Sequence, residues 1–87
     1  MTLQQLRYVI QAADSRSMNE AAKALYISQP SLSEAIKELE KEIGIELFKR
    51  SSHGTVLTPE GEEFLGYARQ VTDQYQLLEN RYIYRTK

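Results

Sequence analysis

The chain has 87 residues, 41% of them hydrophobic, a composition that suits one small globular core. It contains no cysteine, which excludes disulfides, thiolate metal sites and cysteine nucleophiles, and its formal net charge of -1 gives no basic excess of the kind typical of nucleic-acid binders. There is no signal-like start and no run approaching the ~20 apolar residues of a membrane span, so we expect a cytoplasmic protein without membrane contact.

Two short helices are expected at the start of the chain. Thr2 and Gln5 form a capping box, and apolar residues then recur at helical spacing, which predicts a helix from residue 3 to about 14. Ser17 and Glu20 repeat the capping pattern ahead of a second apolar face, which predicts a helix over residues 18 to 25.

A third helix follows after a turn of only three residues, 26 to 28. Ser28 is a good N-cap, Pro30 is tolerated in a first helical turn, and Gly44 is placed to cap the C-terminus. We expect five of its residues to face the core: Leu32, Ala35, Ile36, Leu39 and Ile43. Two short helices joined by a tight turn indicate a helix-turn-helix.

A hairpin and a long helix complete the chain. Residues 46 to 50 and 55 to 58 flank a segment of hairpin composition, and Thr58 and Pro59 are typical of the start of a helix. Apolar or small residues of this last helix recur in steps of 4, 3, 4, 3 and 4, at Phe64, Ala68, Val71, Tyr75, Leu78 and Tyr82. A heptad seam of this kind favours pairing with a second copy, although a helix packed back on its own domain is the alternative.

The expected fold is therefore mainly α: a winged helix-turn-helix, with a three-helix core and a two-stranded wing over residues 1 to 58, followed by a long linker helix for dimerisation over residues 59 to 87. In a winged helix-turn-helix that binds DNA, the third helix enters the major groove. There, Gln29 can pair with adenine, Ser33 with donors or acceptors, and Glu34 with cytosine.

Other candidate DNA contacts surround this helix. Ser28 and Ser31 are short enough to let the first-turn amides approach a phosphate, and Pro30 offers an apolar surface to a thymine methyl group. Cations of the third helix and the hairpin can contact the DNA backbone or the minor groove: Lys37, Lys41, Lys49, Arg50 and His53. A solvated polar helix face and a turn with scattered charges are the alternatives for these two groups.

Enzyme chemistry finds no support in the sequence. The four glycines are dispersed, no nucleophile elbow, phosphate-binding glycine loop or zinc-protease motif occurs, and His53 is the only histidine. We therefore expect no catalytic residues, no metal site and no cofactor.

Residues 6 to 65, "LRYVIQAADSRSMNEAAKALYISQPSLSEAIKELEKEIGIELFKRSSHGTVLTPEGEEFL", resemble the N-terminal DNA-binding domain of the LysR-type transcriptional regulators. The resemblance rests on several motifs in order: "AA" then "L" in the second helix, "SQPSLS", "LE" and "IG" in the third, then "LFKR" and "LTPEG". It implies a homodimer that binds an interrupted palindrome, with the linker helix paired antiparallel to its copy. A small-molecule effector would bind only in a C-terminal domain that lies outside this chain.

The resemblance also assigns roles to single residues. Seven match DNA-contacting positions of the family, six on the recognition helix and one on the wing: Gln29, Pro30, Ser31, Ser33, Glu34, Lys37 and Arg50. His53 stands where the family often has a second wing arginine, which predicts a weaker or pH-dependent contact. Position 34 varies in the family and is acidic here, so Glu34 is a candidate for sequence specificity.

The alternative function is a winged-helix module that binds protein rather than DNA, which the acidic residues would suit. Under the DNA hypothesis, the near-neutral charge is a matter of distribution, and the glutamates at positions 38, 40, 42 and 46 are expected to lie away from the cations. Salt dependence separates the two hypotheses, because neutralising phosphates makes affinity fall steeply with salt.

Overall fold

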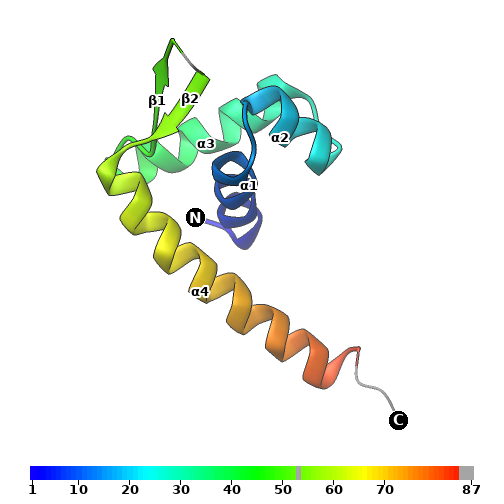
Figure 1. The fold of residues 1–87 in the computed structure, drawn as a ribbon. Coiled ribbons are helices and arrows are strands. Elements are labelled where there is room, and N and C mark those ends of the chain that lie inside the picture. The colour runs from blue at the N-terminus through cyan, green and yellow to red at the C-terminus, as the bar shows by residue number, and fades with distance from the viewer. Residues whose placement is uncertain (53, 85–87) are drawn as a thin grey trace.

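The computed structural model describes residues 1–52 and 54–84; His53 lies outside them. Within this part of the chain, the elements in order are α1 (Leu3–Asp14), α2 (Met18–Leu25), α3 (Gln29–Ile43), β1 (Phe48–Ser51), β2 (Gly54–Leu57) and α4 (Pro59–Tyr82). The first three helices form a compact body, β1 and β2 project from it as an antiparallel wing, and α4 runs away from it as a long rod (Figure 1). The expected winged helix-turn-helix is confirmed.

Helix boundaries follow the capping residues seen in the sequence. Thr2 forms a complete capping box with Gln5, and Ser17 accepts a hydrogen bond from the Glu20 N–H. At the end of α3, Gly44 adopts a left-handed conformation with φ 71° and donates its N–H to the Glu40 carbonyl at 2.8 Å. Side-chain oxygens thus satisfy amides that helix starts leave unpaired.

Tyr26 ends α2 in an unexpected way. It is the non-glycine residue with positive φ in the described chain, at 59°, and its N–H bonds to the carbonyls of Ala22 and Lys23. Left-handed backbone is unfavourable for a residue with a side chain, and glycine usually takes this capping position. The side chain of Tyr26 is 95% exposed, so packing of the ring does not compensate for the strain.

The core lies among α1, α2, α3 and the segment that leads into the wing. Its fully or nearly fully buried members are Val9, Ala21, Ala22, Leu32, Ile36, Leu39 and Leu47. Of the five residues expected to face inward from α3, three are buried, whereas Ala35 and Ile43 are half-buried. Leu47, expected in a strand, instead precedes β1 and inserts into the core.

The start of α4 is packed tightly against Leu47. Thr58 is buried; its hydroxyl donates to the Glu46 carbonyl at 2.6 Å and accepts from the Gly61 N–H at 2.9 Å. The Thr58 N–H donates to the Leu47 carbonyl at 2.9 Å. A Cβ on Gly61 would lie 2.2 Å from that same carbonyl oxygen. Glycine at this position therefore permits close approach between helix and chain.

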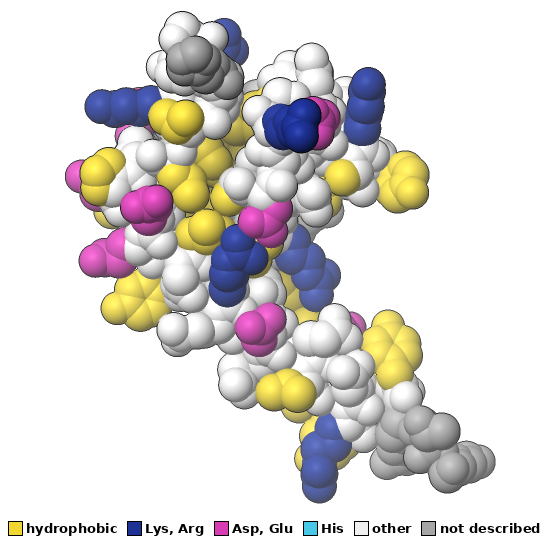
Figure 2. Space-filling model, in the orientation of Figure 1, with side chains coloured by type: hydrophobic (Ala, Val, Ile, Leu, Met, Phe, Trp, Pro, Cys, Tyr) yellow, Lys and Arg dark blue, Asp and Glu magenta, His cyan; other side chains and the backbone are white. Residues whose placement is uncertain are grey.

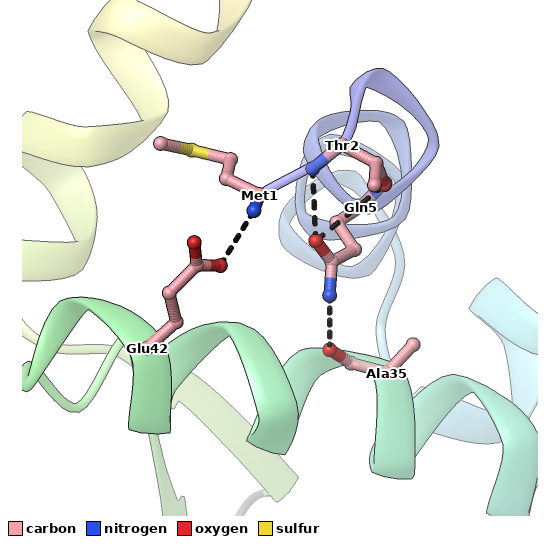
Figure 3. A network of polar contacts seen from close by, with 5 residues as sticks. All are labelled: Met1, Thr2, Gln5, Ala35 and Glu42. Carbon is pink, nitrogen blue, oxygen red and sulfur yellow. Dashed lines mark hydrogen bonds and ion pairs between the residues drawn. The ribbon is translucent and has the colours of Figure 1, made fainter.

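A polar network joins the start of α1 to α3 (Figure 3). The Gln5 carboxamide accepts from the Thr2 N–H at 2.9 Å and donates to the Ala35 carbonyl at 3.3 Å. The amino group of Met1 pairs with the Glu42 carboxylate at 2.6 Å. One glutamine thus caps α1 and fixes it against α3.

The heptad seam of α4 divides into two parts. Ala68 is 2% exposed and Phe64 packs against the core, so both are already covered within a single chain. The other four residues are exposed to different degrees: Val71, Tyr75, Leu78 and Tyr82. Within the single chain, α1 packs against α4 and Arg7 lies over the Tyr75 ring, and the pairing of the six residues with a second chain stays a prediction. In the described residues, no helix combines the length and apolarity needed to cross a membrane.

Candidate nucleic-acid interface

The first turn of α3 is organised by its serines. The Ser28 hydroxyl accepts from the Ser31 N–H at 3.2 Å and donates to the Ser31 hydroxyl at 2.8 Å. Pro30 occupies the first turn, where a missing N–H costs no hydrogen bond, and all three residues are exposed. The tip of the helix is consequently small, polar and open to an approaching ligand.

Gln29 and Ser33 are coupled on the next turn. The Gln29 Nε2 donates to the Ser33 hydroxyl at 2.6 Å, and both side chains are half-buried. A primary amide has two N–H donors and one carbonyl acceptor. One donor and the acceptor of Gln29 are thus left for a partner, and that pair of groups matches the Hoogsteen edge of adenine.

The wing carries two cations on β1. Strand β1 pairs with β2 so that Lys49 lies opposite Val56 and Arg50 opposite Thr55, and both cations are exposed. The predicted contact of His53 lies outside the described residues. The hairpin therefore presents two adjacent positive side chains from one strand.

A groove of about 210 Å³ separates α3 from the wing. Residues from α2, α3 and both strands line it: Met18, Gln29, Ser33, Ile36, Lys37, Glu40, Phe48, Lys49, Arg50 and Thr55. The structure thus brings together five of the predicted contact residues from two elements: Gln29, Ser33, Lys37, Lys49 and Arg50. The groove combines hydrogen-bonding groups on its α3 wall with cations on its wing wall.

The remaining predicted contacts on α3 lie outside this lining. Ser28, Pro30 and Ser31 form the exposed tip of the helix, and Glu34 is exposed one position beyond Ser33. They extend the polar surface of α3 beyond the groove. Glu34 is thus exposed on α3, outside the groove.

Glu40 corrects one expectation. It lines the groove with the cations instead of lying away from them, and its Oε2 accepts from the backbone N–H groups of Leu47 at 2.6 Å and Phe48 at 3.2 Å. The carboxylate thus closes the loop between α3 and β1 and positions the wing. No sequence pattern indicates this role, because the partner is a backbone N–H group seven residues away, outside the helix.

Charge is distributed unevenly over the surface (Figure 2). In this view, several Lys and Arg side chains lie around the upper end and several Asp and Glu side chains lie on the left edge below the wing, while both kinds are mixed in the middle of the molecule. A net charge near zero therefore coexists with a local concentration of Lys and Arg around the upper end of this face.

Comparisons with known proteins agree with this architecture. Residues 3–62 match the model of the bacterial regulatory helix-turn-helix proteins, lysR family. The uncharacterized HTH-type transcriptional regulator YxjO of Bacillus subtilis (strain 168) is 43% identical over 76 residues, which cover 87% of this chain and 26% of that protein. The HTH-type transcriptional regulator BudR of Klebsiella aerogenes is 52% identical over 64 residues, 74% of this chain and 45% of that protein.

Among solved structures, the BenM domain in the crystal structure "BenM_DBD/benA site 1 DNA Complex" superposes with a TM-score of 0.88 at 37% identity. The match covers 93% of this chain and 94% of that one. The chain thus spans only about a quarter of YxjO, but nearly all of the BenM domain. On the family match and these identities, the chain belongs to the lysR family of bacterial regulatory helix-turn-helix proteins.

Proposed function

We propose that this chain is a sequence-specific DNA-binding domain that acts in bacterial transcription regulation in the cytoplasm. The first turns of α3 enter the major groove, and the wing contacts the backbone or the minor groove. The observation that carries the proposal is the groove in which Gln29 and Ser33 of α3 face Lys49 and Arg50 of β1. Base-reading amide and hydroxyl groups lie on one wall, and phosphate-neutralising cations lie on the other.

The similarity to the BenM domain supports this proposal over protein binding. That domain was crystallised with DNA, and 93% of the present chain superposes on it. We assign phosphate contacts to Ser28 and Ser31, an apolar contact with a thymine methyl group to Pro30, and a role in base preference to Glu34, because these side chains are exposed beside Gln29. His53 stays a predicted wing contact.

We further propose that the chain binds an interrupted palindrome as a homodimer, with residues 1 to 58 as the DNA-binding unit and α4 as the dimerisation element. The exposed seam residues support this, because a row of exposed large apolar side chains at heptad spacing on a helix that projects from its domain is normally covered by another helix. They are Val71, Tyr75, Leu78 and Tyr82. Two-fold symmetry then presents two copies of α3 to two half-sites.

Selection of bound sequences from a random duplex pool, followed by anisotropy titration of the selected duplex, tests the proposal. Three cations per chain, six per dimer, are available from Lys37, Lys49 and Arg50. If all six meet phosphates, affinity falls about 10³-fold between about 50 and 200 mM salt. A flat salt response, or no enriched sequence, would count against DNA binding and favour a protein partner.

Replacing Gln29 tests the reading role of α3. We expect Gln29→Ala to weaken binding to the selected duplex by about 1–3 kcal/mol while leaving random duplexes nearly unaffected. Gln70→Ala, which removes an exposed carboxamide on α4, is the matched control and should change neither. Equal weakening on both duplexes would reduce Gln29 to a phosphate contact.

A further inference from the structure

The body of the domain and the long helix α4 meet along α1. The first turns of α4 are fixed by packing, since Gly61 and Ala68 are buried and Phe64 and Leu65 contact the core. Beyond Ala68, no α4 residue in the described chain is buried. Packing of the first turns gives the helix its starting direction, and contacts that α1 makes past this point act on the exposed part with a longer lever arm.

An ion pair marks the place where α4 leaves the body. Arg69 Nη2 lies 2.7 Å from Asp14 Oδ1, and Nη1 lies 3.4 Å from Oδ2, so the guanidinium and the carboxylate meet as two forks. The hydrogen bond to Asp14 raises the pKa of Arg69, and the nearby Asp73 carboxylate raises it further. Asp14 is the last residue of α1, and this contact therefore joins the end of α1 to the middle of α4.

A second contact lies further along the same pair of helices. The Arg7 guanidinium carbon is 5.4 Å from the centre of the Tyr75 ring, a cation–π arrangement. Arg7 precedes Asp14 by seven residues, so the two contact points on α1 are separated by about 10 Å at 1.5 Å per residue. Together with the packed first turns, two separated contacts hold α4 along more of its length than one contact would.

We propose that the Asp14–Arg69 ion pair and the Arg7–Tyr75 stacking set the angle between α4 and the α1–α3 body, and through it the half-site separation that the dimer prefers. This inference rests on the proposed function as a dimeric DNA-binding domain. The residues are positioning residues: they lie on α1 and α4, whereas the proposed reading residues lie on α3 and the wing.

The geometry makes small changes in this angle consequential. From Arg69 to Tyr82, α4 extends for 13 residues, about 20 Å. A rotation of about 10° over a 20 Å arm moves its end by ~3.5 Å, close to the ~3.4 Å rise of one base pair. Half-site spacing is thus sensitive to a tilt that would barely alter packing inside the body.

Exposure of the ion pair makes it suitable for this role and for testing. Both side chains are about half exposed, and exposed ion pairs contribute little to stability. Asp14→Asn and Arg7→Gln should therefore fold normally. Asp73→Asn is the matched control, because it removes a carboxylate near Arg69 on the same helix without cutting a link to α1.

The first measurement is a spacing series. Two copies of the selected half-site are separated by spacers that change one base pair at a time, and affinities are measured by anisotropy for each variant. Wild type and Asp73→Asn should prefer one spacer. In the Asp14→Asn/Arg7→Gln double variant, the preference over neighbouring spacers should fall at least about threefold. A separate charge-exchange variant, Asp14→Arg with Arg69→Asp, should keep part of the spacer preference that the double variant loses. An unchanged spacing profile in the double variant would overturn the inference.

The second measurement does not depend on DNA. Because the chain has no cysteine, Lys41→Cys on α3 and Asn80→Cys on α4, both at exposed positions, give two unique sites for spin labels. With labelled chain diluted in unlabelled chain, electron–electron distances should be narrowly distributed in wild type and broader or shifted in the double variant. Identical distance distributions in wild type and the double variant would overturn the proposed role of these contacts in setting the angle, even if the protein did not bind DNA. Equal wild-type affinity for single and paired half-sites would instead refute the proposed dimer.

Discussion

Two glycines of α4 provide a sharp test of how the wing is joined to the long helix. At Gly61, an added Cβ would lie 2.2 Å from the Leu47 carbonyl oxygen, which also accepts the Thr58 N–H. At Gly66, on the same helix, an added Cβ meets nothing within 4 Å. Replacing glycine by alanine thus places a methyl group against backbone atoms at position 61 and in open space at position 66.

The expected effects have opposite signs. Gly61→Ala forces backbone apart, which costs about 1–3 kcal/mol as overpacking, and disturbing the Thr58 hydrogen bond adds about 1 kcal/mol, for a total of roughly 2–4 kcal/mol. Gly66→Ala should raise the free energy of unfolding by about 0.8–1 kcal/mol through helix propensity alone. The two variants should therefore differ by roughly 3–5 kcal/mol, a large part of the stability of a small domain.

Urea unfolding followed by far-ultraviolet circular dichroism measures this difference. A Gly61→Ala protein that fails to fold meets the expectation, provided that Gly66→Ala folds. A Gly61→Ala protein as stable as Gly66→Ala would show that the Leu47 segment yields without cost, and the tight joint between wing and helix would be refuted.

Three further predictions concern the turn, the seam and the wing. Tyr26→Gly should raise the free energy of unfolding by about 0.5–1 kcal/mol in urea titrations, because it relieves the left-handed backbone strain and removes a side chain that makes no packing contacts. A lower free energy of unfolding would contradict this. Leu78→Glu should dissociate the proposed dimer in sedimentation, whereas Gln70→Glu, on the outer side of α4, should not; an unchanged mass for both would show that the seam does not pair. Glu40→Ala should lower thermal stability by about 1–3 kcal/mol, because two amides lose their acceptor, and an unaltered melting temperature would argue otherwise.

Local signals were enough to predict the elements of this fold. Caps at Thr2, Ser17, Ser28 and Thr58 each act on residues near in sequence, so their chemistry can be read without the tertiary structure. The same holds for Gly44, whose role depends only on backbone conformation. Gln29, Ser33 and Lys37, which line the groove from α3, were also predictable, since helical periodicity separates the inner face from the outer one.

Contacts between segments were harder to predict. A heptad seam shows that a stripe must be covered, but it does not show by what, and in the fold Ala68 is buried and Phe64 partly buried against the chain's own body. Glu40 looked like one more surface glutamate, because its partners are backbone amides at the start of the wing, seven and eight residues away. Leu47 had the composition of a strand residue, and only the fold shows that it anchors the wing.

The buried Thr58 has a practical consequence for anyone exchanging parts between members of this family. Its hydroxyl bonds backward to Glu46 and forward to Gly61, so the return of the wing and the first turn of the long helix are a single interlocked piece. A chimaera spliced between residues 58 and 59 would join halves that evolved with different partners. Crossover points before residue 45 or after residue 68 keep this piece intact, and recombinants made there should express as folded protein far more often.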